Sequence, residues 1–376
     1  MTFPQDSLSG DIPRELRFCF RHVVLQPTTA CNLNCSYCYL PDRRKSMKMT
    51  IEVASAVANG IEDVPHSITL VWHGGEPLAC GLSVFRELVK VFHRLHKRGK
   101  VSHNVQTNGT LITQGWCDFF KDEGFTIGVS LDGDENQNAN RVTWGESRSH
   151  ASVMRGIERL RKNNLDFGII AVVNPSNIND PYAFYDFFAS LNCRSLNVNI
   201  EEKEGLNRSS EGLASSKVRW FWSELFKAWA AKPVMRIREI DSALGWMESV
   251  CKEQKPQRSF TRDFWPTVSC NGDVVVLSPE FMAVSEHEKS QFIVGNVLQT
   301  PLTEIVYDSM ITSYVQDFFV GVSKCLRTCP YYSFCGGGEA SNKYFELGDI
   351  KATETAHCRN SRQFVVDAIL ASLSNQ

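Results

Sequence analysis

Short runs rich in valine, isoleucine and phenylalanine alternate with amphipathic stretches between residues 22 and 230. This repeated alternation is typical of strand–helix units built around a parallel sheet. The predicted strands cover residues 22–26, 68–72, 104–107, 126–130, 168–173 and 196–200. The predicted helices cover residues 50–62, with Thr50 as N-cap, and residues 84–97, 114–122, 152–163, 182–191 and 217–231.

The number of units predicts the fold class. Six strand–helix units are fewer than the eight of a closed barrel, so we expect an α/β protein with an open, partial (β/α)6 TIM-like barrel. The pattern changes after a further helix expected at residues 236–250. Residues 266–278 predict a β-hairpin around Asn271-Gly272, and cysteines then concentrate between residues 325 and 358. We therefore divide the chain into an N-terminal extension (1–21), a barrel (22–250) and a C-terminal domain (251–376).

Composition narrows the class of protein. With 376 residues and 43% hydrophobic content, the chain can bury a large core. Its formal net charge of -2 gives no general attraction to nucleic acid or anionic membranes, so we expect neither as a partner. No apolar run approaches the roughly 18 residues that cross a bilayer, and no signal-peptide pattern is present, which predicts a cytoplasmic protein. Thirteen cysteines, an odd number, suit metal ligation better than a disulfide framework.

Three of these cysteines follow the first predicted strand. Cys31, Cys35 and Cys38 form a C-x3-C-x2-C arrangement on a short polar loop. Three thiolates can hold three irons of a [4Fe-4S] cluster and leave the fourth iron open for a reaction partner. A zinc site or buried free cysteines are the alternatives, although zinc favours paired C-x2-C units or added histidine.

The same spacing resembles the signature of the radical S-adenosylmethionine (SAM) superfamily, in which an aromatic residue, here Tyr37, precedes the last cysteine. The resemblance implies that the open iron binds the amino and carboxylate groups of SAM. It also implies that one electron, supplied by an external donor such as flavodoxin or ferredoxin, splits SAM into methionine and a 5'-deoxyadenosyl radical. That radical would then remove hydrogen from the substrate.

The second predicted strand ends in a motif that resembles the superfamily's GGEP sequence, formed here by Gly74, Gly75, Glu76 and Pro77. Ligands of parallel sheets gather at the carboxyl ends of the strands, and glycines let backbone carbonyls approach an ammonium group closely. The resemblance implies that this motif binds the amino group of SAM. A simple turn is the alternative, because turns use the same residue types.

Polar residues follow the next strands at the same predicted rim. Asn108 follows the third strand, while Ser130 and Asp132 end the fourth. The resemblance assigns Ser130 to the ribose or carboxylate region of SAM and Arg141 to its carboxylate, a role suited to a bidentate guanidinium. For Asn108 and Asp132, a turn that satisfies its own backbone is an equal alternative.

Four further cysteines lie near the C-terminus, at Cys325, Cys329, Cys335 and Cys358. Four thiolates can complete the coordination of a second [4Fe-4S] cluster, although such a set can also form a structural zinc site. The segment resembles the SPASM extension of peptide-modifying radical SAM enzymes. Its first interval is x3, where that family usually has x2.

A full SPASM domain carries seven cysteines for two auxiliary clusters, and this chain departs from that pattern. Leu277 and Glu339 stand where the family has cysteine, so we expect one auxiliary [4Fe-4S] cluster. Cys251 and Cys270 lie near the region and remain candidates for a partial second cluster. The other cysteines are more often small buried apolar residues than ligands.

The stretch 329–360 most closely resembles peptide maturases that form three-residue cyclophanes. The resemblance implies a ribosomally made precursor peptide as substrate and removal of a β-hydrogen from one of its residues. The resulting carbon radical would attack an aromatic ring two positions earlier, and rearomatisation would release one electron and one proton. We expect the auxiliary cluster to take the electron and Glu280, or else Asp273, to take the proton; a solvated carboxylate is the alternative for both residues.

Three other functions stay open at this point. A related enzyme could oxidise a Cys or Ser of a sulfatase to formylglycine, although Leu277 and Glu339 argue against that reading. A thioether-forming radical SAM enzyme is a second alternative. A non-catalytic metal-binding scaffold is a third, and it predicts that the reduced protein forms no 5'-deoxyadenosine.

Overall fold

A computed structural model describes residues 17–207, 212–252, 261–284 and 290–374, so most of the predicted N-terminal extension lies outside the described residues. Seven parallel strands form the centre of the sheet. In spatial order they are β2 (His22–Leu25), β3 (Ile68–Trp72), β4 (Val101–Thr107), β5 (Thr126–Ser130), β6 (Phe167–Val173), β7 (Ser195–Ile200) and β8 (Arg236–Ile237). The predicted partial barrel is therefore confirmed.

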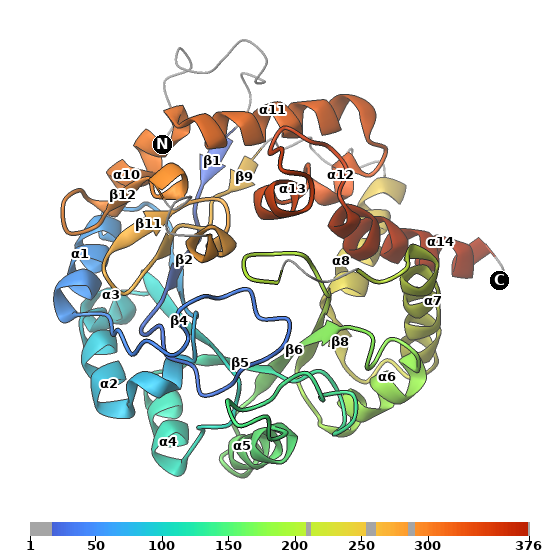
Figure 1. Ribbon diagram of the computed structural model, residues 1–376, viewed down its shortest axis with the longest axis horizontal. Helices are drawn as coiled ribbons and strands as arrows, with labels where there is room; N and C mark the ends of the chain where they lie inside the picture. Colours follow the sequence, from blue (N-terminus) through green and yellow to red (C-terminus); the bar gives the residue numbers. More distant parts are fainter. Residues whose placement is uncertain (1–16, 208–211, 253–260, 285–289, 375–376) are drawn as a thin grey trace.

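Helices form an outer ring around these strands (Figure 1). They are α1 (Ile51–Ile61), α2 (Leu82–Lys90), α3 (His93–Lys97), α4 (Gln114–Asp122), α5 (His150–Lys162), α6 (Pro181–Ser190) and α7 (Ser215–Ala231). Thr50 is the N-cap of α1, as expected, because its side chain accepts a hydrogen bond from the Val53 amide. The single helix expected at residues 84–97 is two helices, α2 and α3.

The predicted hairpin is present, and its strands extend the barrel sheet. The strands β10 (Thr267–Val268) and β11 (Asp273–Val275) are antiparallel, and β12 (Gly295–Asn296) pairs with β11. Gly272 adopts φ +93° in the turn, a conformation that glycine accommodates without strain. On its other side β10 pairs in parallel with β2, so a single ten-stranded sheet crosses the boundary expected near residue 250.

Short strands and helices complete the described chain. A separate two-stranded sheet joins β1 (Arg17–Cys19) to β9 (Thr261–Asp263), and the expected linking helix is α8 (Arg238–Cys251). Short 3-10 turns cover Pro77–Cys80, Pro279–Ala283 and Ser309–Ile311, and a π-helical turn covers Cys358–Gln363. The C-terminal helices are α10 (Leu302–Asp308), α11 (Ser313–Thr328), α12 (Tyr332–Cys335), α13 (Ala340–Leu347) and α14 (Phe364–Ser374).

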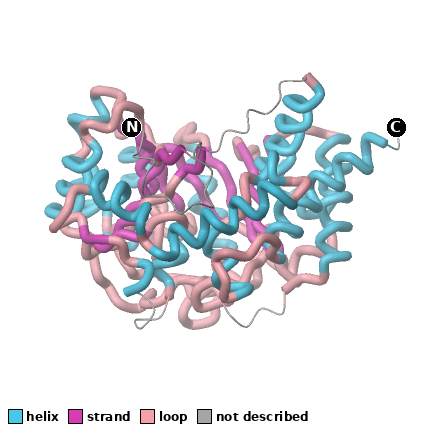
Figure 2. The backbone as a smooth tube through the Cα atoms, turned by 90° about the horizontal axis from the view of Figure 1, so that it is seen from above, coloured by secondary structure: helices cyan, strands magenta, loops and turns pink. Residues whose placement is uncertain are grey.

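The C-terminal segment packs against the barrel rather than standing apart from it. Helix α14 lies beside α7 and α8 (Figure 1), and Figure 2 shows the helix that leads to the C-terminus next to other helices at one end of the molecule. One continuous hydrophobic core includes Val23 of β2, Phe221 of α7 and Phe319 of α11. Among the described residues no helix is both long enough and apolar enough to span a bilayer.

Candidate active site

The three N-terminal cysteines line a cavity of about 280 Å³ at the carboxyl ends of the barrel strands. Cys31, Cys35 and Cys38 lie on the loop that follows β2, and this loop crosses the mouth of the barrel (Figure 1). The cavity is also lined by residues from the ends of β3 to β7. A cavity at this edge of a parallel sheet is the usual place for a ligand.

The cysteine loop is held by backbone hydrogen bonds to two neighbouring segments. The Asn34 amide donates to the Val142 carbonyl at 2.7 Å, and the Glu76 amide donates to the Ala30 carbonyl at 2.7 Å. Gly75 explains the second contact, because at φ +62° its backbone packs so closely that an added Cβ would lie 2.6 Å from the Ala30 oxygen. The glycine predicted to contact SAM therefore also packs against the cysteine loop.

The thiol environment fits a cluster better than a single metal ion. Burial raises the pKa of Cys31 to about 12 in the protein alone, so a metal must stabilise the thiolate that it binds. Among the described residues no three His, Cys, Asp or Glu side chains converge as a mononuclear ion requires. Cysteines that each bind a separate iron of a cubane need not converge in that way.

Glu76 acts as an organising centre beneath the cavity. Its buried carboxylate accepts hydrogen bonds from the Thr107 hydroxyl at 2.6 Å, the Asn108 amide at 2.7 Å and the Leu78 amide at 3.0 Å. Burial raises its pKa, and these hydrogen bonds oppose that effect. The carboxylate thereby joins the ends of β3 and β4, where the amino group of SAM is expected.

Arg141 fits the role expected for it. Its guanidinium is buried, lines the cavity and donates to the Tyr37 hydroxyl at 2.7 Å, while that hydroxyl donates to Asp132. Its Nη1 lies 3.7 Å from an Asp132 carboxylate oxygen. Its buried Nε has no hydrogen-bond partner among the described residues. A buried donor without an acceptor is costly, so this side chain suits an arriving carboxylate such as that of SAM.

The remaining residues expected to bind SAM divide into two groups. Asn108 and Ser130 line the cavity, and the Ser130 hydroxyl accepts a hydrogen bond from Gln106 at 2.9 Å. Gly74, Pro77 and Asp132 do not line it. Asp132 is fully buried behind Tyr37 and Arg141, where it orients both side chains.

Of the two carboxylates nominated as proton acceptor, the structure brings Glu280 into the cavity. Burial raises the pKa of Glu280 to about 7, although a hydrogen bond from Ser278 opposes the shift. Asp273 does not line the cavity. Its carboxylate instead accepts hydrogen bonds from Asn271 at 2.7 Å and Asn296 at 2.8 Å within the hairpin.

Three further carboxylates, Glu201, Glu202 and Glu204, line the same cavity and were not anticipated. Although burial opposes ionisation, the ion pair with His357 lowers the pKa of Glu202. Burial, followed by the nearby charge of Glu280, raises the pKa of Glu204. Their position just after β7 was the available signal, but a run of charged residues before a glycine is more often a solvated turn.

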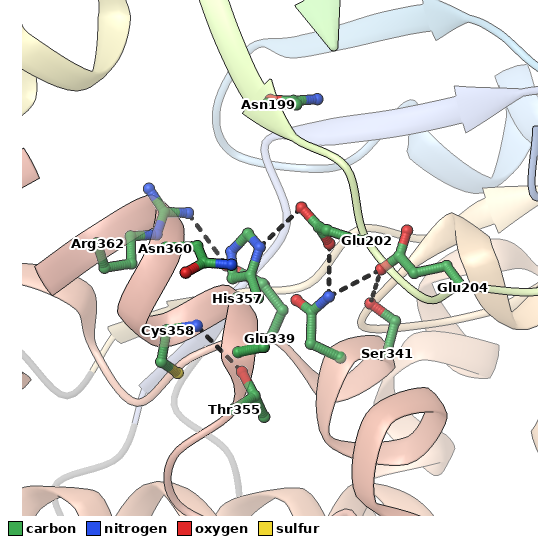
Figure 3. Close-up of polar contacts among 12 residues, drawn as sticks. Asn199, Glu202, Glu204, Glu339, Ser341, Thr355, His357, Cys358, Asn360 and Arg362 are labelled. Carbon is green, nitrogen blue, oxygen red and sulfur yellow. Dashed lines mark hydrogen bonds and ion pairs between the residues drawn. The ribbon is translucent and has the colours of Figure 1, made fainter. Parts of the chain in front are cut away.

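Glu202 and Glu204 connect the barrel to the segment that carries the C-terminal cysteines (Figure 3). Glu202 contacts the His357 ring at 2.7 Å, and the Asn342 amide donates to Glu204 at 3.1 Å. His357 immediately precedes Cys358, whose amide donates to the Thr355 hydroxyl at 3.1 Å. One hydrogen bond and one step along the chain therefore link the first cavity to the second set of cysteines.

The four C-terminal cysteines line a second cavity, of about 310 Å³. It is lined by all four predicted ligands, Cys325, Cys329, Cys335 and Cys358, although they come from different segments of the chain. Neither Cys270, which is buried, nor Cys251, which is exposed on α8, lines it. The arrangement fits a closed cluster with four protein ligands.

Comparison with known proteins identifies the family. The model of the radical SAM superfamily matches residues 25–188. An uncharacterized protein of Synechocystis sp. is 32% identical over 93% of this chain and 91% of its own length. A cysteine-type anaerobic sulfatase-maturating enzyme of Clostridium perfringens is 30% identical over 84% of this chain and 88% of its own length. The chain belongs to the radical SAM superfamily.

Solved structures of radical SAM proteins share the fold. The structure of anSMEcpe with bound AdoMet and the Cp18Cys peptide has a TM-score of 0.76 at 21% identity and covers 94% of this chain and 98% of that chain. Streptococcus suis SuiB bound to precursor peptide SuiA has a TM-score of 0.66 at 16% identity, covering 90% and 76%. The cofactors of this radical SAM enzyme are accordingly SAM and a [4Fe-4S] cluster.

Proposed function

We propose that this enzyme modifies a ribosomally made precursor peptide by joining the β-carbon of one residue to an aromatic ring, which forms a cyclophane. The observation that carries the proposal is the position of Glu280, a partly buried carboxylate that lines the same cavity as Cys31, Cys35 and Cys38. Formation of a carbon–carbon bond to a ring needs a proton acceptor at the reacting atoms. SuiB, which shares the fold, was solved with a precursor peptide, and this supports a peptide as the substrate class.

In this proposal, separate groups of residues bind the first cluster and SAM. Cys31, Cys35 and Cys38 would hold the first cluster, while Gly75 and Glu76 would bind the amino group of SAM and Arg141 its carboxylate. When bound, the cofactors supply a 5'-deoxyadenosyl radical that removes hydrogen and an iron–sulfur acceptor for the electron released later. Burial of the site limits the access of water to these reactive species.

The proposed reaction balances. The peptide loses one hydrogen atom from a β-carbon, that carbon forms a bond to the aromatic ring, and the ring then loses one proton and one electron. Glu280 receives the proton. Cys325, Cys329, Cys335 and Cys358 would hold the electron acceptor. The product is therefore lighter than the substrate by two hydrogen atoms.

The test is to incubate the anaerobically reconstituted, reduced enzyme with a peptide encoded beside its gene. The peptide should carry an aromatic residue two positions before its crosslinking partner. We expect 5'-deoxyadenosine, loss of two hydrogen atoms and fragmentation spectra in which the three-residue segment no longer breaks. If 5'-deoxyadenosine forms while every such peptide stays unmodified, the cyclophane proposal fails.

Formylglycine formation is the second candidate, favoured by the similarity to the Clostridium perfringens sulfatase-maturating enzyme. Tandem mass spectrometry separates the two functions. Oxidation of serine also removes two hydrogen atoms, whereas oxidation of cysteine to formylglycine in addition replaces the sulfur by an oxygen from water. In both cases the product peptide still fragments between every pair of residues and reacts with hydrazines as an aldehyde does. A hydrazine adduct on a sulfatase-derived peptide would favour this candidate.

A further inference from the structure

A strip of positive charge lies on the surface directly outside the cysteine loop. Residues 42–48, which we call the basic strip, contain four basic residues, Arg43, Arg44, Lys45 and Lys48, and one acidic residue, Asp42. All but Arg43 of these basic residues are exposed. Met47 lies within the strip with 47% of its surface exposed. Because the whole chain has a net charge of -2, this density of positive charge is local.

The basic strip is fixed to the backbone of the cysteine loop. The Cys31 amide donates to the Arg43 carbonyl at 2.9 Å. The hydroxyl of Thr29 donates to the Lys45 carbonyl at 2.6 Å, and the hydroxyl of Thr28 donates to the Met47 carbonyl at 2.7 Å. These bonds alternate along the strip, so its charged side chains extend from a backbone that the cysteine loop itself positions.

A single aromatic side chain connects the strip to a proposed cluster ligand. The indole nitrogen of Trp144 donates to the Cys31 carbonyl at 2.8 Å. The guanidinium of Arg44 lies over the same ring, 4.4 Å from its centroid, in a cation–π contact. The path from the exposed charge to the cysteine backbone therefore passes through two direct contacts.

We propose that the basic strip is the docking surface for an acidic one-electron carrier protein that reduces the first cluster. Docking here would bring the carrier to the outer side of the cysteine loop without blocking the cavity that holds SAM and the peptide. Complementary charge guides and orients such an encounter, and the exposed Met47 supplies the apolar centre that transient interfaces often contain. In each encounter the carrier is oxidised by one electron and the cluster is reduced by one, with no bond made or broken.

This inference rests on the proposed ligands Cys31, Cys35 and Cys38, and not on the identity of the peptide. The test therefore measures 5'-deoxyadenosine from SAM cleavage, first without any peptide. A double variant, Arg44→Glu with Lys45→Glu, is reduced either by limiting reduced flavodoxin or by excess dithionite. We expect its kcat/KM for flavodoxin to fall about tenfold or more at low salt, with the difference shrinking as ionic strength rises. The dithionite-driven rate should stay unchanged, and the Kd of the variant for oxidised flavodoxin, measured by titration calorimetry at low salt, should rise by a similar factor.

The chain offers a matched control in Arg161→Glu with Lys162→Glu. This is also an adjacent arginine–lysine pair, and Lys162 contacts Glu158 as Lys45 contacts Asp42. Arg161 and Lys162 are the last two residues of α5, shortly before β6 begins. They therefore lie at the opposite end of the strands from the cysteine loop. Both rates of the control should equal those of the unmodified protein.

Three outcomes would overturn the proposal. An unchanged kcat/KM for flavodoxin would show that the strip does not receive the carrier. An equal loss with dithionite would show that the substitutions disturb the cluster itself. A raised KM for the precursor peptide, measured with dithionite, together with unchanged flavodoxin kinetics would assign the strip to an acidic peptide instead. No 5'-deoxyadenosine from the unmodified protein with either reductant would instead count against the proposed cluster site.

Discussion

At the scale of single residues, the role of Glu280 as proton acceptor leads to a specific prediction about pH dependence. Burial raises its pKa to about 7, so the carboxylate is partly protonated at neutral pH and becomes a competent proton acceptor only as pH rises. We therefore expect peptide crosslinking to increase with pH through about 7 and then level off. Glu280→Gln should lower crosslinking about 100-fold while 5'-deoxyadenosine still forms, which a mass-spectrometric ratio of the two products would reveal.

Ser278 provides the control for that prediction. Its hydroxyl donates to Glu280, and this hydrogen bond lowers the pKa of the carboxyl group. Ser278→Ala should therefore move the midpoint of the pH profile to higher pH without removing it. A profile that is identical in the unmodified protein and in Glu280→Gln would assign the proton transfer to another group.

Arg141 leads to a prediction about binding. A lysine at this position keeps the positive charge but loses the fork of donors that matches a carboxylate. Arg141→Lys should therefore weaken SAM binding by about tenfold to 100-fold, as measured by equilibrium titration of the reconstituted protein. Affinity equal to that of the unmodified protein would mean that the unpaired Nε serves another purpose.

The sequence predicts the place of a side chain where a motif determines it. It does not predict contacts that depend on the tertiary fold. The sequence predicts Asn108, Ser130 and Asp132 at one rim; Asn108 and Ser130 line the cavity, whereas Asp132 does not. It does not predict that Tyr39 and His73, 34 residues apart, meet at 3.1 Å in the same cavity. No local pattern encodes such a pairing, because it depends on how the cysteine loop folds over β3.

At the scale of elements, we expect that the cluster held by the C-terminal cysteines can be lost while the first cluster stays bound. Cys329 lies in the loop between α11 and α12 and lines the second cavity. Cys329→Ser should lower the iron content from about eight to about four per chain, because one of two cubanes is lost. Some 5'-deoxyadenosine should still form, whereas crosslinked peptide should not.

Cys251→Ser is the matched control for this prediction. Cys251 is exposed on α8 and does not line the second cavity, so its replacement should leave the iron content unchanged. About twelve irons per chain in the unmodified protein would require further ligands and would revise the count of one auxiliary cluster. Loss of iron from Cys251→Ser would identify one of those ligands.

The elements also show what hydrophobic patterning can and cannot predict. The expected strand at 126–130 matches β5 because its five residues alternate between buried positions and positions that are partly or fully exposed. The strand expected at 104–107 begins earlier, at Val101, and the part that is not predicted contains His103, a polar residue that is buried and accepts a hydrogen bond from Trp72. A polar residue whose burial depends on a distant partner breaks the pattern on which the prediction relies.

At the scale of the whole molecule, the sheet joins parts of the chain that the sequence pattern separates. The hydrophobic pattern changes near residue 250, yet β10 adds to the edge of β2. The Val24 amide donates to the Pro266 carbonyl at 2.9 Å, and the Gln26 amide donates to the Val268 carbonyl at 3.0 Å. The hydrophobic pattern shows where the strand–helix repeat ends. It does not show that the chain returns to pair with β2, because strand pairing depends on residues far apart in the sequence.

This continuity predicts that a chain ending at residue 250 does not fold as an independent barrel. The cut would leave the amides of Val24 and Gln26 unpaired at an open sheet edge and would uncover the apolar sides of α7 and α8, which α14 now covers. The Trp222 indole would also lose its acceptor, the Asn360 carbonyl at 2.7 Å. Each large apolar side chain exposed costs about 1.5–3 kcal/mol, so a few of them exceed the stability margin of a typical domain.

We expect the fragment to bind a hydrophobic dye and to lack a cooperative thermal transition by circular dichroism, whereas the full chain melts cooperatively. A fragment that melts cooperatively and incorporates about four irons would instead establish residues 22–250 as a separate domain.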